Sequence, residues 1–584
     1  MLPTNNLVGP MLTDYYQLTM AYAYWKSGRQ DEPAVFDLFF RKNPFGGEFT
    51  LFAGLEEVLR MVSNFRFTKS DIEYLKNGVQ QTEENLEKQF NRALEDGLIR
   101  KTENGYEQYV FTEDESPKWI PVKQPKRNSK VKAPMAHCEN EFFTWLKSID
   151  CSKIKIKAFR EGSLVFPRLP LIRVEGPIAI AQLLETPILT LINYPCLIAT
   201  KAARMRLAAG KDKNLMEFGL RRAQGPDGGV SASRYSYIGG FNSTSNVIVG
   251  KTFGIPISGT HAHSFVSSFT SLDEVKNTML KDSKGNEHDI KELALKFRSE
   301  LGYTSTNDGE LAAFISYAMA FPSEFLALAD TYDIMKSGIP NFMSVALALN
   351  SIGYKPLGIR IDSGDLAYYS KEIRKFFKDI DKKYSNGFSK LLIVASNDID
   401  ESTIDSLNNQ HHEINSFGIG THLVTCNGQP ALGGVYKLVE FNGQPRIKIS
   451  QEVGKMTLPG RKTPYRLYGK EGYAILDLMI SDDEEPPKKG EKILCRHPLN
   501  PEKRVYVIPE KVEPLHYCVW DGKRTISEEP LGKTRDYCLK QLSSWREDHL
   551  RTLNPTPYKV SVSDHLYNKM YELRQKETPI ETIG

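Results

Sequence analysis

The sequence predicts an α/β fold built around a parallel sheet, because strand-like and helix-like runs alternate through its central part. In chain order, apolar strand-like runs and amphipathic helical runs alternate over 355–362, 368–384, 390–396, 400–410 and 414–420. This order is typical of βαβ units, whose helices cover a sheet of parallel strands. Upstream, the alternation extends to runs at 254–259, 310–321 and 324–333. These strands suffice for a barrel, complete or irregular, although periodicity alone does not distinguish a barrel from a doubly wound sheet.

The N-terminal part is expected to combine one helix with short strands. Asp14 is placed to cap a helix over 15–26, and Gln17 follows three residues on, as in a variant of the capping box. An alternating strand comes next and ends in a Pro/Gly turn, and 154–176 has the pattern of short strands. The lysine-rich and proline-rich segment 80–137 is interpreted as an inserted, solvated loop. A nucleic-acid-binding arm is disfavoured because few aromatic residues interleave with its charges.

After residue 430 the pattern changes to β-hairpins, with an Asn-Gly turn inside 433–450 and a second hairpin around 466–480. Three segments are therefore predicted. They are a β-rich region with helical parts over 1–175, an α/β barrel carrying the active-site loops over 176–430, and a β-rich segment over 431–584.

The composition is that of an ordinary globular protein, with 40% hydrophobic and 25% charged residues. A net charge of +4 over 584 residues argues against a nucleic-acid binder that works through a basic surface. Seven scattered cysteines without a Cys-x-x-Cys pair fit free thiols better than disulfides or a zinc site. The apolar run 186–200 is short and holds two prolines, so it is interpreted as a core segment. No signal peptide is recognised. We expect a soluble, cytoplasmic protein.

Three polar, glycine-containing loops follow successive strands of the predicted sheet, at 360–365, 395–400 and 418–421. In parallel α/β folds, ligands bind at the carboxyl ends of the strands. A strand that ends in glycine and then opens a helix exposes several backbone N–H groups, which suits a phosphate. One such turn would be weak evidence, but three at successive strand ends indicate a binding rim.

Arg360, Asp362 and Asp365 form a compact polar set in the first of these loops. Arg360 and Asp362 lie two residues apart and share a face if the strand continues. The arginine fork suits a carboxylate ligand, and a neighbouring carboxylate can hold a ribose hydroxyl or a magnesium-bound phosphate. A buried structural ion pair explains the same residues equally well.

Two further segments carry side chains suited to chemistry. In 258–265, His261 and His263 are each able to act as a nucleophile or general base, and the residues alone do not choose between them. In 217–229, a pair of arginines beside a glycine-rich turn suggests an anion-facing rim, and Phe218 offers an aromatic plate. A helix end with exposed arginines is the structural alternative. Neither a P-loop nor a dinucleotide-binding fingerprint is present, so any ATP is held in another way.

Ten segments, taken in order, resemble the nicotinate phosphoribosyltransferases of the type II phosphoribosyltransferase family. The resemblance covers most of 10–480, thins over 80–137 and thins again in the last hundred residues. The segments are TDYYQLTM, FRKNPFGG, QLLETP, EFGLRRAQGPDGG, GGFNSTSN, GTHAHSF, RIDSGDL, ASNDID, FGIGTHLVT and LGGVYKLV.

This resemblance implies an irregular (β/α) barrel beside a second, β-rich domain that the N- and C-terminal segments build together. It implies a homodimer whose active sites combine both subunits. The reaction would form nicotinate mononucleotide from nicotinate and phosphoribosyl pyrophosphate, coupled to ATP hydrolysis with Mg²⁺ present. This is the first step of NAD salvage from nicotinate, catalysed by an enzyme of the C–N bond-forming ligase class. Nicotinate, phosphoribosyl pyrophosphate and ATP are thus the expected partners, without nucleic acid or membrane.

Residue roles follow from the resemblance position by position. His263 matches the histidine that ATP phosphorylates, whereas His261 falls where the family pattern varies. The expected nicotinate-binding residues are Tyr16, Phe218, Arg221, Ser245, Thr260 and Arg360, with Tyr16 and Phe218 enclosing the pyridine ring and Arg360 pairing with its carboxylate. The expected phosphoribosyl pyrophosphate-binding residues are Arg41, Asp362, Ser396, Asn397, Gly420 and Thr421, with Lys455 as a further cation. Tyr16 and Arg41 would reach into the partner's site, and Asp362 would meet magnesium through the substrate.

Ser245 bears on the choice between acid and amide. The related nicotinamide phosphoribosyltransferases place an aspartate at this point, where it can accept a hydrogen bond from the amide. A carboxylate facing nicotinate would repel it, at a cost on the order of several kcal/mol in a partly desolvated pocket. Serine favours the acid. A nicotinamide enzyme remains the alternative, as does a catalytically silent nucleotide-binding homologue, which would be expected to lack the histidine or the GIGT loop.

Overall fold

The computed structural model describes residues 2–78, 90–103, 105–110, 118–122, 133–450 and 452–578. Its chain divides into two compact units, and the backbone passes between them several times. The first unit comprises 1–32, 60–153 and 176–187, and the second comprises 33–59, 154–175 and 188–584. The three-segment division of the sequence at 175 and 430 stays a prediction.

The first unit is mainly helical. Its elements are α1 (Tyr15–Lys26), α3 (Lys69–Asn77), α5 (Asn140–Ser148) and α6 (Ile178–Leu183), with strands β3 (Ile99–Thr102), β4 (Gly105–Val110) and β5 (Lys118–Val122). These three strands form an antiparallel sheet inside the segment interpreted as a solvated loop, which corrects that interpretation for the described residues. The segment's lysines and prolines hid its alternating apolar positions from sequence reasoning.

Helix α1 begins as expected after Asp14, but the capping box does not form. Asp14 makes no side-chain cap hydrogen bond, and instead its Oδ2 accepts one from the Thr186 hydroxyl at 3.0 Å. Gln17 is fully buried, and its amide donates to Glu185 at 2.8 Å. Tertiary partners from the start of helix α7 (Glu185–Ala209) thus replace the local capping contact.

The second unit contains the predicted parallel sheet. Its strand order is β10-β9-β16-β15-β14-β13, and every neighbouring pair is parallel. The strands are β9 (Asn214–Glu217), β10 (Ser243–Thr244), β13 (Leu326–Leu328), β14 (Gly358–Ile361), β15 (Leu392–Ala395) and β16 (Ser416–Ile419). A parallel bridge from Thr244 to Ile257 adds one more extended segment beyond β10. The α/β prediction is confirmed.

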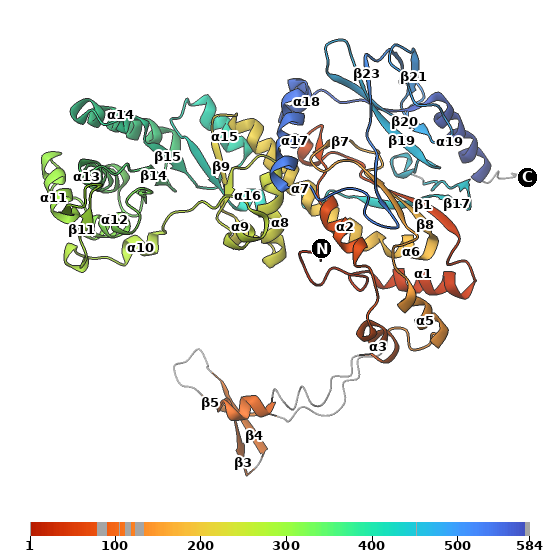
Figure 1. Cartoon of the computed structure of the whole chain (residues 1–584), viewed down its shortest axis with the longest axis horizontal. Coiled ribbons are helices and arrows are strands. Elements are labelled where there is room, and N and C mark those ends of the chain that lie inside the picture. The colour runs from red at the N-terminus through yellow and green to blue at the C-terminus, as the bar shows by residue number, and fades with distance from the viewer. Residues whose placement is uncertain are drawn as a thin grey trace, which may run out of the picture. The chain divides into compact units, whose positions relative to one another are not determined.

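Helices surround this sheet (Figure 1). They are α8 (Gly225–Ile238), α9 (Val247–Phe253), α10 (His263–Ser267), α11 (Ile290–Glu300), α12 (Asp308–Ala320), α13 (Ile339–Ser351), α14 (Leu366–Tyr384), α15 (Glu401–Asn409) and α16 (Thr421–Val424). Side chains cap several of them as their sequences suggest: Asp365 accepts from Tyr368 N at the start of α14, and Asp400 from Thr403 N at the start of α15. A short hairpin, β11 (Met279–Lys281) with β12 (Glu287–Asp289), precedes α11.

Two β-rich sheets complete the second unit. The first has the order β18-β17-β1-β8-β6-β24 and the second β22-β21-β25-β20-β19-β23. The first consists of β1 (Pro33–Phe39), β6 (Lys155–Ala158), β8 (Ile172–Pro177), β17 (Val435–Phe441), β18 (Gln444–Pro445) and β24 (Tyr517–Asp521). Strand β1 pairs with β17, and β6 with β24. N- and C-terminal segments therefore share one sheet, as the family resemblance implied.

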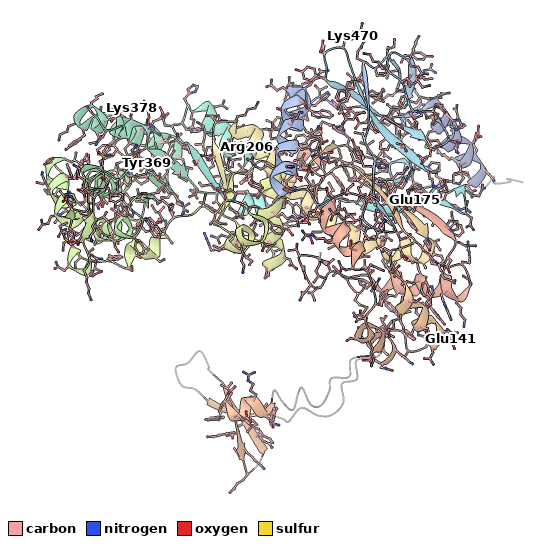
Figure 2. The ribbon with its side chains drawn as sticks, viewed as in Figure 1. Glu141, Glu175, Arg206, Tyr369, Lys378 and Lys470 are labelled. Carbon is pink, nitrogen blue, oxygen red and sulfur yellow. The ribbon has the colours of Figure 1, made fainter. Side chains whose placement is uncertain are left out.

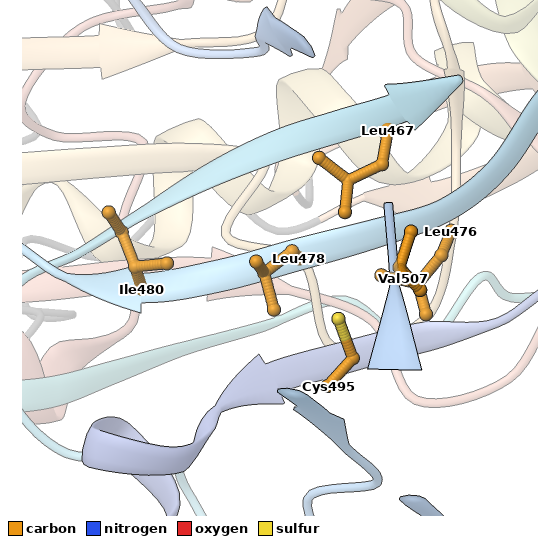
Figure 3. Packing of buried hydrophobic residues seen from close by; sticks show 6 residues of the cluster. All are labelled: Leu467, Leu476, Leu478, Ile480, Cys495 and Val507. Carbon is orange, nitrogen blue, oxygen red and sulfur yellow. The ribbon is translucent and has the colours of Figure 1, made fainter. Parts of the chain in front are cut away.

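The second β-rich sheet encloses its own apolar core. Its strands are β19 (Lys462–Tyr468), β20 (Ala474–Ser481), β21 (Ile493–Arg496), β22 (Arg504–Val507), β23 (Lys511–Pro514) and β25 (Val560–Ser563). Leu467, Leu476, Leu478, Ile480, Cys495 and Val507 pack together there (Figure 3). Two helices, α17 (Leu531–Ser544) and α18 (Glu547–Leu550), lie between β24 and β25 in the chain, and α19 (Asp564–Glu577) follows β25. The small pair β2 (Thr50–Leu51) and β7 (Leu164–Val165), with α2 (Leu55–Ser63), lies in the N-terminal part of the chain.

Helix α7 contains the apolar run 186–200. Together with α6 it forms the one stretch of the described chain, Ile178–Ala209, that is long and apolar enough to cross a membrane, and 67% of its apolar window is buried in the protein. Near its end Arg206, labelled in Figure 2, donates to the carbonyl oxygens of Gly240 at 3.1 Å and Lys213 at 2.7 Å. These bonds fix α7 to the segments that lead into β9 and β10. The seven cysteines all lie in the part of the chain that the structure describes, and none of them is joined in a disulfide.

Candidate active site

Arg360, Asp362 and Ser396 meet where β14 and β15 end. The guanidinium Nε donates to the Ser396 hydroxyl at 2.6 Å, and that hydroxyl donates to Asp362 Oδ1 at 2.8 Å. Arg360 Nη2 lies 3.4 Å from Asp362 Oδ2, and Nη1 lies 3.5 Å from the Thr260 hydroxyl. The ion pair that the sequence left as an alternative therefore exists. Because the short bond uses Nε, both Nη groups make only long contacts and can still engage a ligand carboxylate.

Phe218 supplies an aromatic face next to this arginine. The Arg360 guanidinium carbon lies 5.6 Å from the ring centroid, within the range of a cation–π contact. Phe218 N donates to Ile419 O at 2.8 Å, which fixes the residue at the end of β9 beside β16. Gly418 makes room for the ring, since a Cβ there would lie 2.5 Å from a Phe218 ring carbon. The expected guanidinium and aromatic plate are thus neighbours.

His263 stands on the same rim, as the first residue of α10, and its side chain is 46% exposed. Its Nδ1 lies 3.0 Å from the Thr331 hydroxyl. Its Nε2 lies 3.9 Å from Asp330 Oδ1 and 4.0 Å from Asp362 Oδ2. An exposed imidazole that faces two carboxylates and is held by one hydroxyl can accept and release a charged group at its ring.

Asp330 was not recognised from the sequence. Its carboxylate is almost fully buried, and Oδ2 accepts from Asp362 N at 3.0 Å and from the Ser363 hydroxyl at 2.5 Å. Oδ1, which faces His263, has no hydrogen-bond partner. The sequence signal that could have revealed Asp330 was its position two residues after β13, at a strand end like those of the three loops predicted to form the binding rim. No glycine turn marks this one.

His261 has a different environment from His263. It is 9% exposed, and its Nε2 accepts a hydrogen bond from Leu328 N at 3.2 Å. Burial lowers its pKa to about 4, so the ring is neutral near pH 7. The two histidines that the residues alone did not separate are therefore separated by burial: His263 is open to a ligand and His261 is enclosed.

Ser245 is held at the rim by the backbone of Glu217. Ser245 N donates to Glu217 O at 3.0 Å. The Glu217 carboxylate is fully buried and accepts from the hydroxyls of Ser233 at 2.7 Å and Thr244 at 2.6 Å. This carboxylate thus locks the ends of β9 and β10 together, one residue before Phe218 and one before Ser245. Its role depends on contacts distant in sequence and could not be predicted.

The expected phosphate loops also lie at strand ends. Gly420 caps α16 at the end of β16, and its carbonyl accepts from Leu423 N at 3.1 Å. Thr421 and Asn397 are exposed, and Asp398, next to Asn397, has a left-handed backbone with φ of 45°. Since β15 and β16 are neighbours, both loops open on one edge of the sheet with Ser396.

Four further residues that the sequence singled out have other environments. Tyr16 belongs to the first unit, on α1, and is 49% exposed. Arg41 follows β1 in the β-rich sheet, where its guanidinium lies 5.8 Å from the Phe39 ring centroid and its buried Nε has no hydrogen-bond partner. Arg221 is on the rim segment but exposed, in a short 3₁₀ turn after Phe218. Asp365 caps α14 and does not join the Arg360 cluster.

Family models match nearly the whole chain. The N-terminal domain model of nicotinate phosphoribosyltransferase (NAPRTase) matches 11–119 and 126–193, the NAPRTase family model 213–482, and the C-terminal domain model 461–570. The N-terminal model thus also matches 80–119 and 126–137, and the interpretation of 80–137 as an insertion stays a prediction. The match also extends further toward the C-terminus than the ten motifs indicated.

Curated proteins and solved structures resemble the chain along its length. Nicotinate phosphoribosyltransferase 1 of Arabidopsis thaliana is 50% identical, with 99% of this chain and 96% of the relative covered. The Homo sapiens nicotinate phosphoribosyltransferase is 39% identical, covering 98% and 97%. The crystal structure of human nicotinic acid phosphoribosyltransferase superposes with a TM-score of 0.78 at 37% identity, covering 96% of this chain and 99% of that one.

Proposed function

This chain belongs to the nicotinate phosphoribosyltransferase family, and from that premise we propose how its rim performs the transfer of a phosphoribosyl group to nicotinate. The ring nitrogen of nicotinate attacks C1 of phosphoribosyl pyrophosphate, the bond from C1 to the pyrophosphate oxygen breaks, and nicotinate mononucleotide and pyrophosphate leave. The observation that supports this best is the neighbourhood of Arg360, Phe218 and His263 at adjoining strand ends.

Nicotinate recognition is assigned to the Arg360 fork and the Phe218 ring. The Nη groups of Arg360 take the carboxylate, and Phe218 stacks on the pyridine. Thr260, beside Nη1, and Ser245 and Arg221, on the neighbouring rim segments, line the same pocket. Hydroxyl groups at 245 and 260 can donate to a carboxylate without repelling it, so the acid is favoured over nicotinamide.

Phosphoribosyl pyrophosphate is assigned to the neighbouring strand ends. Asp362 and Ser396 would hold the ribose side, while Asn397, Gly420 and Thr421 would hold the 5′-phosphate. The transfer makes an oxocarbenium-like centre and releases a polyanion, so orientation and electrostatic stabilisation supply most of the catalysis. Arg41 and Lys455 are assigned to the pyrophosphate.

Magnesium is proposed to arrive with the pyrophosphate, whose charge it would neutralise. Among the described residues no group of three or more His, Cys, Asp or Glu side chains could form a protein cage for a metal. This fits a cation that keeps waters and substrate oxygens and needs only one or two carboxylates. Asp362, which is 31% exposed, and the unpaired Oδ1 of Asp330 offer that chemistry on the rim.

ATP coupling is proposed to proceed through His263. A ring nitrogen would take the γ-phosphoryl group from ATP with release of ADP, and water would later remove it as inorganic phosphate. The nearby Asp330 and Asp362 carboxylates stabilise the imidazolium that forms at either step, while Thr331 fixes the ring. With this coupling the enzyme acts as a C–N bond-forming ligase. The phosphorylated residue adds negative charge beside the substrate anions and so promotes product release.

A homodimer would complete the site, with Tyr16 and Arg41 entering from the partner subunit. Within the single chain, each of these side chains can still bind a ligand: the Tyr16 ring is half exposed, and Arg41 Nε has no hydrogen-bond partner. Tyr16 would cover the second face of the pyridine opposite Phe218.

The proposal is tested with the purified chain, radiolabelled nicotinate or nicotinamide, phosphoribosyl pyrophosphate and Mg²⁺, with and without ATP. We expect labelled mononucleotide from nicotinate only, at a rate that ATP raises, with ADP and phosphate formed alongside it. Preference for nicotinamide would overturn the substrate assignment. A rate indifferent to ATP would overturn the coupling while leaving the transfer intact.

A further inference from the structure

We propose that His261 is a positioning residue, whose side chain closes the seam of the irregular barrel and thereby sets the place of His263. The inference rests on the proposed phosphorylation of His263. It assigns a function to the buried histidine that the rim chemistry does not use.

The seam lies between the two edges of the parallel sheet. One edge is extended by Ile257, which bridges to Thr244 next to β10. The other edge is β13, which pairs with β14. In the described chain no backbone bridge joins the segment after Ile257 to β13. Leu328 N, which points from β13 toward this gap, donates to His261 Nε2 at 3.2 Å. An imidazole nitrogen thus takes the place of the strand carbonyl that would close a regular barrel.

The surroundings keep this imidazole in the accepting form. The ring packs against aromatic side chains, with centroid distances of 5.5 Å to Phe265, 6.0 Å to Phe314 and 4.8 Å to Tyr317. Burial is the main reason that a charged ring is disfavoured, and the nearby Arg360 guanidinium disfavours it further, so both lower the pKa of His261. A neutral ring whose Nε2 accepts must carry its proton on Nδ1, so the hydrogen bond selects one tautomer.

The loop that carries both histidines is attached to the sheet at three points. Thr260 contacts Arg360 on β14 at 3.5 Å, His261 bonds Leu328 on β13, and His263 contacts Thr331 three residues after Leu328. The middle attachment is buried, whereas the Thr260–Arg360 contact is partly buried and the His263–Thr331 contact is exposed. Loss of the middle one would let 260–263 move away from β13. The distances from His263 to Asp330 and Thr331 would then change together.

Two variants distinguish the hydrogen-bonding role of His261 from its contribution to packing alone. His261→Leu keeps an apolar side chain in the aromatic surroundings but removes the acceptor. His261→Gln places an amide oxygen near the position of Nε2 and restores it. His516→Leu is the matched control: His516 is a partly buried histidine in the β-rich part, its Nε2 bonds Pro170 O at 2.5 Å, and its ring packs edge-on against Phe159.

The measurements are the ATP-dependent increase in transfer rate and the amount of acid-labile phosphate on the protein. We expect His261→Leu to lower both by roughly tenfold to a hundredfold, because a misplacement of a reacting group by about 1 Å can cost about a hundredfold. His261→Gln should recover most of the loss. His516→Leu should lower the melting temperature without altering the ATP effect. Wild-type phosphorylation in His261→Leu, or equal defects in the Leu and Gln variants, would overturn the proposal.

Hydrogen exchange separates this inference from the proposed function. The Leu328 amide should exchange faster in His261→Leu than in wild type and should be protected again in His261→Gln. If His263→Ala keeps its ATP stimulation, the phosphorylation proposal fails, and the exchange data still decide whether His261 closes the seam. Unchanged Leu328 exchange in His261→Leu would refute the seam contact itself.

Discussion

Arg360 is held through its Nε, while its two Nη groups make only long contacts within the protein. The contribution of these Nη groups to nicotinate binding can therefore be measured by mutation. Replacing Arg360 by alanine removes both Nη donors from nicotinate, and charged hydrogen bonds of this kind are worth about 1.5–3 kcal/mol each. We expect Arg360→Ala to raise the KM for nicotinate by at least about a hundredfold, and that for phosphoribosyl pyrophosphate far less. Steady-state kinetics with each substrate varied in turn measures both. Equal increases in the two constants would contradict the assignment.

His263 gives the second prediction at this scale. The His263→Ala variant should lose ATP stimulation and retain a weak, ATP-independent transfer, because the Arg360 and phosphate-loop contacts remain. Product formation at saturating nicotinate, with and without ATP, checks this. ATP dependence identical to wild type would remove His263 from the coupling.

The buried carboxyl of Glu310 should make the free energy of unfolding depend on pH. It is fully buried on α12, and its Oε2 accepts from the Ser337 hydroxyl at 2.5 Å and the Asn341 amide at 3.0 Å. Burial raises its pKa to about 7. Below about pH 4.5 the carboxyl is protonated in both folded and unfolded chains. Between about 4.5 and 7 the unfolded chain releases a proton that the folded chain retains, so stability falls as pH rises, by at most about 3 kcal/mol.

Glu310→Gln should abolish this dependence. The melting temperature of the variant relative to wild type should therefore rise between pH 5 and pH 7.5. Glu324→Gln, which makes the same charge change at an exposed position, serves as the control. A constant difference between Glu310→Gln and wild type across this range would show that Glu310 is ionised in the fold.

At the scale of elements, the strand ends decide how the rim is shaped. Gly418 in β16 faces the Phe218 ring, and a Cβ there would also lie 3.1 Å from Ser396 Cβ. We expect Gly418→Ala to displace the ring, destabilise the fold by about 1–3 kcal/mol and weaken nicotinate binding. Thermal unfolding and nicotinate KM are the measurements. Gly532→Ala on α17, where a Cβ meets open space, should change neither. An unaltered nicotinate KM in Gly418→Ala would mean that Phe218 does not contact the pyridine ring of nicotinate.

How much of the fold could be predicted also becomes clear at this scale. The β14–α14–β15–α15–β16 alternation was readable because buried parallel strands are short apolar runs and because Asp365 and Asp400 precede their helices. The Arg360 and Ser396 loops were found by the same rule. Asp330 was missed since its strand is three residues long and no glycine turn follows.

Contacts between residues far apart in the sequence could not be predicted from local sequence patterns. His261 and Leu328 are bonded across 67 residues, and no periodicity links them. The pairing of β1 with β17 joins the two ends of the chain, and only resemblance to a family suggested it. The strands inside 80–137 were hidden by charge and proline, which normally indicate a solvated segment.

At the scale of the whole molecule, the proposed homodimer predicts complementation. If Arg41 acts in the partner's site and Arg360 in its own, Arg41→Ala and Arg360→Ala subunits together form one intact site in each mixed dimer. Random pairing makes half of the dimers mixed, so co-expression should restore about one quarter of wild-type activity. Assays of each variant alone and of the co-expressed pair test this. No recovery, with mixed dimers shown to form, would place both arginines in one subunit's site.

The pairing of β1 with β17 also affects how the protein is made. Ala34 is matched with Phe441, and all residues of β1 after Pro33 are buried. A ribosome adding roughly 5–20 residues per second needs about 20–80 seconds to travel from one to the other. During that interval an apolar strand has emerged without its neighbour. Nascent chains of this protein should therefore engage chaperones that hold exposed hydrophobic segments until the C-terminal half is synthesised.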